Sequence, residues 1–143
     1  MHSEPGAILL VGNDEVTRNR LATLLLNVGF EVAIANSASD AWQSPCVGYV
    51  DLILLDLAMR DMVSINLLRK LRGIHSMTEL PVIIVSARNE SRHIVDALGA
   101  GANDFVTRPI DMEVALTRIR THLSLKRADE EIAKTYSRNS TCG

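Results

Sequence analysis

One aspartate in this sequence stands where its side chain could do chemistry. Asp56 follows the apolar run Leu52 to Leu55, which is too short for a typical helix and too uniformly apolar for a half-exposed strand. The run predicts a strand covered on both faces, with Asp56 where that strand ends. In open parallel α/β sheets the functional crevice lies beyond the carboxyl ends of the strands. Asp56 is therefore either a reactive carboxylate or a loop aspartate bonded to its own backbone, which is the commoner fate of such a residue.

Polar residues also follow other apolar runs that predict strands. Asn13 and Asp14 come after the first run, Ser86 ends the fourth, and Arg108 follows the fifth. Because the carboxyl ends of parallel strands share one edge, we expect these side chains to meet Asp56 there. An acceptor carboxylate, a hydroxyl and a cation can cradle a phosphoryl group, with catalysis mostly by positioning and charge neutralisation.

Short apolar runs alternate with segments of helical periodicity along the whole chain. The expected strands cover residues 7–11, 31–35, 52–55, 80–85 and 103–107. The expected helices cover residues 15–27, 37 to the proline at 45, 64–72, 89–98, and a long segment from Asp111 that extends past the sheet. Trp42, in the second helix, is expected to pack against the sheet. This alternation predicts an α/β fold with a doubly wound, five-stranded parallel sheet and helices on both faces.

Length and composition favour one folded domain. The chain has 143 residues, 47% of them hydrophobic, and a net charge of -2, which argues against direct nucleic-acid binding. No segment predicts a signal peptide or a membrane span. Cys46 and Cys142 are expected to be free thiols, as in a cytoplasmic protein. We expect a disordered segment at 1–6, a folded domain at 7–125, and a helical linker with a frayed tail from Tyr136 at 126–143.

Two classes of enzyme on similar architectures are disfavoured. A flavin or dinucleotide phosphate needs a glycine-rich or hydroxyl-rich loop after the first strand, and here Asp14 and Glu15 would repel it. A Ser-His-Asp hydrolase is disfavoured because Ser86 lacks the Gly-x-Ser-x-Gly setting and no histidine follows a strand. We therefore expect that the chain is not an enzyme.

The order and spacing of four segments resemble the receiver domain of two-component response regulators, a flavodoxin-like fold, over residues 7–125. The segments are residues 8–11, 51–59, 80–87 and 101–109. The resemblance implies that Asp56 accepts a phosphoryl group from a sensor histidine kinase and that Ser86 contacts the phosphoryl oxygen. It further implies that Phe105 is an aromatic switch residue coupled to Ser86, that the Arg108–Pro109 peptide bond is cis, and that the backbone carbonyl of Ala58 is a metal ligand.

Two departures from the family pattern bear on the metal and the cation. Gly12 and Asn13 stand where receivers usually carry two acidic residues for Mg²⁺, which leaves Asp14 and Asp56 as the nearby carboxylates. Because Mg²⁺ is held by carboxylate and phosphate oxygens, we expect its binding here to be weak or absent. Arg108 replaces the family's lysine, and a guanidinium grips a carboxylate with two bonds. We hypothesise that Arg108 holds Asp56 without a metal.

Two forms of activity remain open. The chain is either a phosphoacceptor with weakened Mg²⁺ dependence or a pseudo-receiver that signals through protein contacts alone. The expected partners are a histidine kinase or phosphotransfer protein and an output domain in a longer chain. A homodimer through the fourth helix, fifth strand and fifth helix is expected by analogy with the family. The stripe formed by Leu125, Ala128, Ile132 and Thr135 is typical of a short coiled-coil linker.

Overall fold

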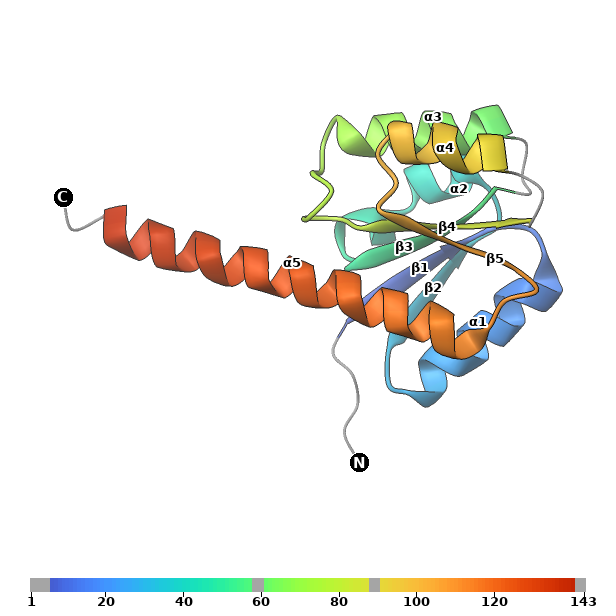
Figure 1. The fold of residues 1–143 in the computed structure, drawn as a ribbon, viewed down its shortest axis with the longest axis horizontal. Coiled ribbons are helices and arrows are strands. Elements are labelled where there is room, and N and C mark those ends of the chain that lie inside the picture. Colours follow the sequence, from blue (N-terminus) through green and yellow to red (C-terminus); the bar gives the residue numbers. More distant parts are fainter. Residues whose placement is uncertain (1–5, 58–60, 88–90, 141–143) are drawn as a thin grey trace.

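The computed structural model describes residues 6–57, 61–87 and 91–140, and the chain folds into alternating strands and helices (Figure 1). The elements in chain order are β1 (Ala7–Val11), α1 (Glu15–Asn27), β2 (Glu31–Ala35), α2 (Ala38–Gln43), the 3-10 turn η1 (Pro45–Gly48), β3 (Leu52–Asp56), α3 (Asp61–Arg72), β4 (Val82–Ala87), α4 (Ser91–Gly99), β5 (Asp104–Arg108) and α5 (Met112–Ser140).

The five strands form one parallel sheet in the order β2-β1-β3-β4-β5. Helices α1 and α5 cover one face, while α2, α3 and α4 cover the other (Figure 1). The predicted doubly wound architecture is therefore confirmed. The strand order reverses between β1 and β3, so a crevice is expected beyond the carboxyl ends of these two strands. Asp56 at the end of β3 and the loop after β1 flank that point.

Each face of the sheet has its own apolar core, as expected for strands buried on both sides. All five residues of β1 and of β3 are buried. On the α1 and α5 side, the strands pack against Leu25 and Ile119, and on the other side against Leu68 and Ala97. Side chains on both faces thus hold the ends of β1 and β3 in fixed positions.

Several element boundaries differ from those predicted. Helix α3 begins at Asp61, earlier than the predicted residue 64. Strand β4 begins at Val82, later than the predicted residue 80, because Pro81 has no N–H for the ladder, although its carbonyl accepts a bond from the Ile53 amide at 3.0 Å. Strand β5 runs one residue further along than predicted and includes Arg108. The predicted helix at 89–98 is α4, which begins at Ser91 in the described chain.

Trp42 does not pack against the sheet, so that prediction was wrong. Its exposed fraction is 36%, and the Lys70 ammonium on α3 lies 5.5 Å from the centre of its ring. The small residues Ala38 and Ala41 supply the buried face of α2 instead. The indole therefore lies beside α3 at the surface.

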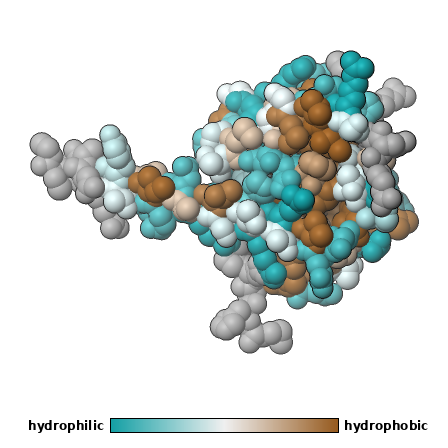
Figure 2. Space-filling view, viewed as in Figure 1, coloured by the Kyte–Doolittle hydropathy of each residue, from teal (hydrophilic) through white to brown (hydrophobic). Residues whose placement is uncertain are grey.

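Helix α5 begins at the predicted cap and extends well beyond the sheet (Figure 1). The Asp111 carboxylate accepts bonds from the Glu113 amide at 3.0 Å and the Val114 amide at 3.3 Å. Its first half is anchored by buried apolar residues, whereas Leu125 and Ile132 are 54% and 68% exposed. Figure 2 shows apolar side chains along the projecting part of this helix. The helix continues to Ser140 and so passes Tyr136, where fraying was predicted.

The remaining predictions about the ends of the chain are tested only in part. The segment predicted as disordered lies outside the described residues except for Gly6, and so do residues 141–143. Cys46 is a free thiol, while Cys142 lies outside the described residues. Among the helices that the structure describes, none has the length and apolar content that crossing a bilayer demands.

Candidate functional site

The strand ends bring two carboxylates onto one guanidinium. Arg108, the last residue of β5, donates from Nη2 to Oδ2 of Asp56, which ends β3. Its Nε lies 3.4 Å from Oδ2 of Asp14, in the loop after β1. The Asp56 side chain is 8% exposed and the Arg108 side chain 20% exposed, so solvent screens this ion pair little. Arg108 therefore links three of the loops at this edge of the sheet.

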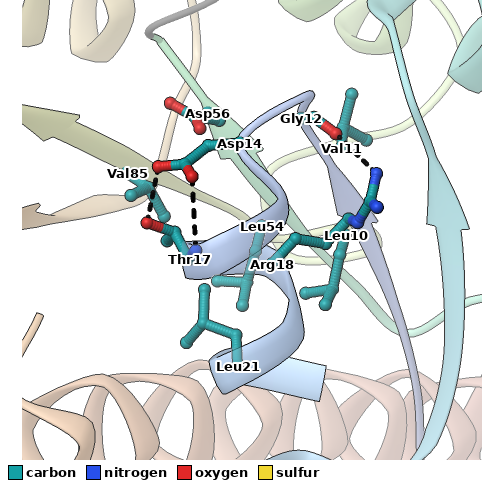
Figure 3. Close-up of a pocket in the computed structure, with 10 residues that line it drawn as sticks. All are labelled: Leu10, Val11, Gly12, Asp14, Thr17, Arg18, Leu21, Leu54, Asp56 and Val85. Atoms are coloured by element: carbon teal, nitrogen blue, oxygen red, sulfur yellow. Dashed lines mark hydrogen bonds between the residues drawn. The ribbon is translucent and has the colours of Figure 1, made fainter. Parts of the chain in front are cut away.

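Thr17 is a fourth member of this cluster and was not identified from the sequence. Asp14 caps α1, and the Thr17 hydroxyl donates to its Oδ2 at 2.7 Å (Figure 3). This hydroxyl also accepts a bond from Arg108 Nε at 3.4 Å. The Thr17 hydroxyl bond is the main cause that holds the pKa of Asp14 below its ordinary value, and Arg108 adds to the effect. A threonine three residues after a capping aspartate was the available signal.

Three of the four residues that were expected to hold Mg²⁺ are described by the structure. Asp14 and Asp56 are both engaged by Arg108, Asn13 is exposed, and Gly12 has no side chain. Ala58, whose carbonyl was the remaining expected ligand, lies outside the described residues. No group of three or more His, Cys, Asp or Glu residues in the described chain could hold a metal ion. Among the described residues, the candidate donors are thus two carboxylates that are already paired with Arg108.

Ser86 lies at the same edge of the sheet with its hydroxyl buried. It follows Val85, which is the register partner of Asp56 on the neighbouring strand. The side chain is fully buried, and Oγ has no hydrogen-bond partner within the described part of the chain. An unpaired buried hydroxyl is costly, so it is a good candidate for contact with a polar group that enters the site.

We expect replacement of Ser86 by alanine to leave the free energy of unfolding unchanged or to raise it by up to about 1 kcal/mol, because the variant removes a buried hydroxyl without a partner. Ser64 is the matched control. It is equally buried, but its Oγ donates to the Asp56 carbonyl at 3.4 Å, so Ser64→Ala should lower the free energy of unfolding by about 1 kcal/mol. Urea unfolding of both variants tests this; a clear loss of stability in Ser86→Ala would contradict it.

Phe105 and the proline after Arg108 complete the set of predicted residues. Phe105 is partly buried against the core on the α3 and α4 face, and the Arg118 guanidinium lies 6.0 Å from the centre of its ring. The Arg108–Pro109 peptide bond is cis, as the resemblance implies. Phe105 thus lies on β5 three residues before Arg108, with the Arg118 side chain of α5 near its ring.

A second charged cluster joins β5 to α5 and was also missed from the sequence. Arg118 donates from Nη1 to both carboxylate oxygens of Asp104, at 2.9 and 3.1 Å. Nε2 of His122 lies 3.0 Å from Asp104 Oδ2. Partial burial on its own would raise the pKa of Asp104. Hydrogen bonds from His122, the Phe105 amide and Arg118 outweigh burial and hold this pKa below the ordinary 3.8.

This lowered pKa predicts acid sensitivity. The folded chain binds a proton at Asp104 less readily than the unfolded chain, so Asp104 stabilises the fold fully above about pH 3.8 and loses that contribution as the pH falls through its folded pKa. The stability difference between the native chain and Asp104→Asn should therefore shrink below this pH. Urea unfolding between about pH 6 and about pH 2.5 measures it. A difference that stays constant across that range would contradict the assignment.

The fold and the cluster at its edge define a doubly wound α/β domain with an acidic site at the switch point. A sequence model of the family described as "Response regulator receiver domain" matches residues 8–120, and the chain belongs to this family. Receiver domains are typically signalling domains without an enzymatic role of their own, and they generally bind Mg²⁺ at an acidic pocket. The chain is thus a receiver domain of two-component phosphorelay signalling.

Relatives and solved structures agree with this assignment. The chain is 36% identical over 126 residues to the transcriptional regulatory protein KdpE of Mycobacterium tuberculosis. This match covers 87% of this chain and 54% of KdpE. It is 35% identical over 120 residues to the transcriptional regulatory protein YkoG of Bacillus subtilis, covering 84% of this chain and 52% of YkoG. The crystal structure of NtrX from Brucella abortus, at 23% identity, shares the fold with a TM-score of 0.85 over 96% of this chain and 30% of NtrX. The chain spans about half the length of KdpE and of YkoG.

Proposed function

We propose that Asp56 is the phosphoacceptor of this receiver and takes its phosphoryl group from a sensor histidine kinase or a phosphotransfer protein. The observation that carries the proposal is the place of the Asp56 carboxylate at the end of β3, beside the switch point of the sheet. Ser86 supports it, since its buried hydroxyl can bond an incoming phosphoryl oxygen. Membership of the receiver family supports the same role.

The proposed transfer is a single displacement at phosphorus. A carboxylate oxygen of Asp56 bonds to phosphorus while the bond from phosphorus to the donor's imidazole nitrogen breaks, and the imidazole then takes a proton from solvent. Negative charge on the transferred group is shared among its equatorial oxygens. Arg108 and Ser86 neutralise and orient that charge, which is the main catalytic task in such reactions. Phe105 then responds to the position of the Ser86 side chain.

We further propose that Mg²⁺ binds this site weakly. The support is that the carboxylates of Asp14 and Asp56 are both engaged by Arg108 and that Gly12 offers no ligand. Breaking these ion pairs would offset part of the free energy that a bound cation supplies. A phosphoryl group on Asp56 would bring new oxygens, so the affinity should be greatest in the phosphorylated chain.

A pseudo-receiver is the second candidate. The observation that favours it is the engagement of the acceptor carboxylate by a guanidinium, which must release or share Asp56 before a phosphoryl group can form. In that role the domain would act through protein contacts alone. The same partner surface would serve both functions.

The partner surfaces are proposed from the fold and the relatives. We place a homodimer or effector contact on α4, β5 and α5, where Val95 and Val114 are 66% and 43% exposed. We also propose that α5 leads to an output domain in a longer cytoplasmic protein, because KdpE and YkoG are about twice as long as the region they share with this chain. Direct binding of nucleic acid by this domain is not proposed.

Incubation with a small phosphodonor, with and without Mg²⁺, followed by intact mass spectrometry, tests the proposal. We expect one phosphoryl group per chain, with a smaller dependence on Mg²⁺ than ordinary receivers show. A chain that stays unmodified under both conditions, and with a histidine kinase as donor, would favour the pseudo-receiver.

A further inference from the structure

Gly12 lies directly against the acceptor residue. A Cβ atom built on Gly12 would lie 2.9 Å from Asp56 Cβ and 3.2 Å from Asp56 Oδ2, and real Cβ atoms essentially never come closer than 3.0 Å. Gly12 is buried, and its φ lies outside the left-handed region that favours glycine. The requirement for glycine at this position is therefore one of space and not of backbone conformation.

The surrounding contacts leave the Gly12 backbone little freedom to move away. Its amide donates to the Ala35 carbonyl of β2 at 3.0 Å, and its carbonyl accepts a bond from Arg18 Nη1 at 3.4 Å (Figure 3). Asp56 is held in turn by the β3–β4 register and by Arg108. The closest contact is with the Asp56 Cβ, which side-chain rotation does not move, so a side chain at residue 12 would shift the Asp56 residue itself and its carboxyl with it.

The charges in the cluster also disfavour an acidic side chain at residue 12. One guanidinium, on Arg108, faces the carboxylates of Asp14 and Asp56. A third carboxylate at residue 12 would add negative charge beside Asp56, and the other guanidinium nearby, on Arg18, already donates to the Gly12 carbonyl and to Asn36 Oδ1. Like charges at such separations repel by several kcal/mol at the dielectric constant typical of protein surfaces. An acid at residue 12 would therefore have to overcome charge repulsion as well as the close contact with Asp56, and a change of the cation at residue 108 can relieve only the repulsion.

We propose that Gly12 is a positioning residue for Asp56 and that it works as a pair with Arg108. The missing side chain lets the Asp56 carboxyl lie where the guanidinium can reach it, and the guanidinium then serves as a fixed counter-ion in place of a divalent cation. This inference rests on the proposed function in taking Asp56 as the acceptor. It adds that residues 12 and 108 together decide which cation the site accepts.

The first test compares a methyl group at two glycines. Gly12→Ala should lower the Tm by about 5 °C, since it forces a well-packed group to shift. Gly48→Ala is the matched control, because a Cβ there meets nothing within 4 Å, and it should change the Tm by less than about 2 °C. Equal, small effects of the two substitutions would overturn the proposal.

The second test measures the rise in Tm that Mg²⁺ produces in Gly12→Asp, in Arg108→Lys and in the double variant, with EDTA as the reference. We expect a rise in the double variant and little or none in either single variant. A full response in Arg108→Lys alone would show that Gly12 does not limit cation binding. A full response in Gly12→Asp alone would show that Arg108 does not block it. Either result, or no response in the double variant, would overturn the proposal. Arg108→Lys keeps the glycine, so it decides the matter even where variants at residue 12 do not fold.

The same samples separate this inference from the proposed function. If the native chain takes up no phosphoryl group while the paired Mg²⁺ response is found, the proposed phosphoacceptor role fails and the pairing of Gly12 with Arg108 stands. If the native chain is phosphorylated and the paired response is absent, the pairing fails alone.

Discussion

Asp56→Asn is expected to abolish phosphorylation completely. Asparagine keeps the size of the side chain but has no carboxylate oxygen to attack phosphorus, so no acyl phosphate can form. The variant should remain folded, because Arg108 keeps its contact with Asp14, and should lose about 1–2 kcal/mol of unfolding free energy with the ion pair. Intact mass after treatment with a small phosphodonor, together with urea unfolding, measures both effects.

Asp129→Asn provides the control for this substitution. Asp129 is exposed on the part of α5 beyond the sheet, far along the chain from the cluster, so its variant should be phosphorylated like the native chain. Phosphorylation that persists in Asp56→Asn would place the acceptor elsewhere. Asp14 would then be the next carboxylate to replace.

Arg108→Met is expected to lower the free energy of unfolding by about 3 kcal/mol. The substitution leaves the Asp56 carboxylate, 8% exposed, without its guanidinium, and removing one partner of a buried pair carries a penalty of this size. Arg108→Lys keeps the charge and should cost about 1 kcal/mol, because the compact ammonium cannot bridge Asp14 and Asp56 as the fork does. Urea unfolding at neutral pH gives both values.

Arg20→Met controls for the loss of an arginine. Arg20 is exposed on α1, so its replacement should change the free energy of unfolding by no more than about 0.5 kcal/mol. If Arg108→Met were as harmless as Arg20→Met, the ion pair with Asp56 would carry no stability, and the view of Arg108 as a structural counter-ion would have to be abandoned.

Local patterns were sufficient to predict most of the fold and the position of Asp56. The bounds of β1, α1 and β2 agree with the predicted ranges, because each ends at a turn or cap that the sequence marks, as Gly29 does after α1. Asp56 could be placed because a short apolar run followed by a carboxylate is a signal within one segment. In a parallel sheet the ends of β3 and β5 lie at the same edge, so Asp56 was also expected to lie near Arg108.

Contacts between distant segments could not be predicted in the same way. Thr17 and Arg108 are 91 residues apart, and the bond between them forms because the long Arg108 side chain reaches from the end of β5 to the first turn of α1. Arg72 is a similar case. The sequence predicts only that it ends a helix, but its guanidinium donates to the Gly101 carbonyl at 2.8 Å and to the Leu80 carbonyl at 2.9 Å. The positions of such side chains follow from packing and not from any local period.

The close contact between Gly12 and Asp56 could not be predicted from the sequence either. From the sequence, Gly12 is a missing ligand, and only the structure shows that the absent side chain leaves room for Asp56. The errors in the predicted starts of α3 and β4 are only two or three residues. They reflect end effects such as the missing N–H of Pro81.

A Mg²⁺ titration of the unphosphorylated native chain, followed through the amide resonances of Gly12, Thr17 and Leu57, tests most directly whether Arg108 holds Asp56 in place of a metal. We expect small shifts that do not saturate at Mg²⁺ concentrations that fill ordinary receivers. Saturable binding with ordinary receiver affinity would show instead that the guanidinium gives way to the ion and does not stand in for it.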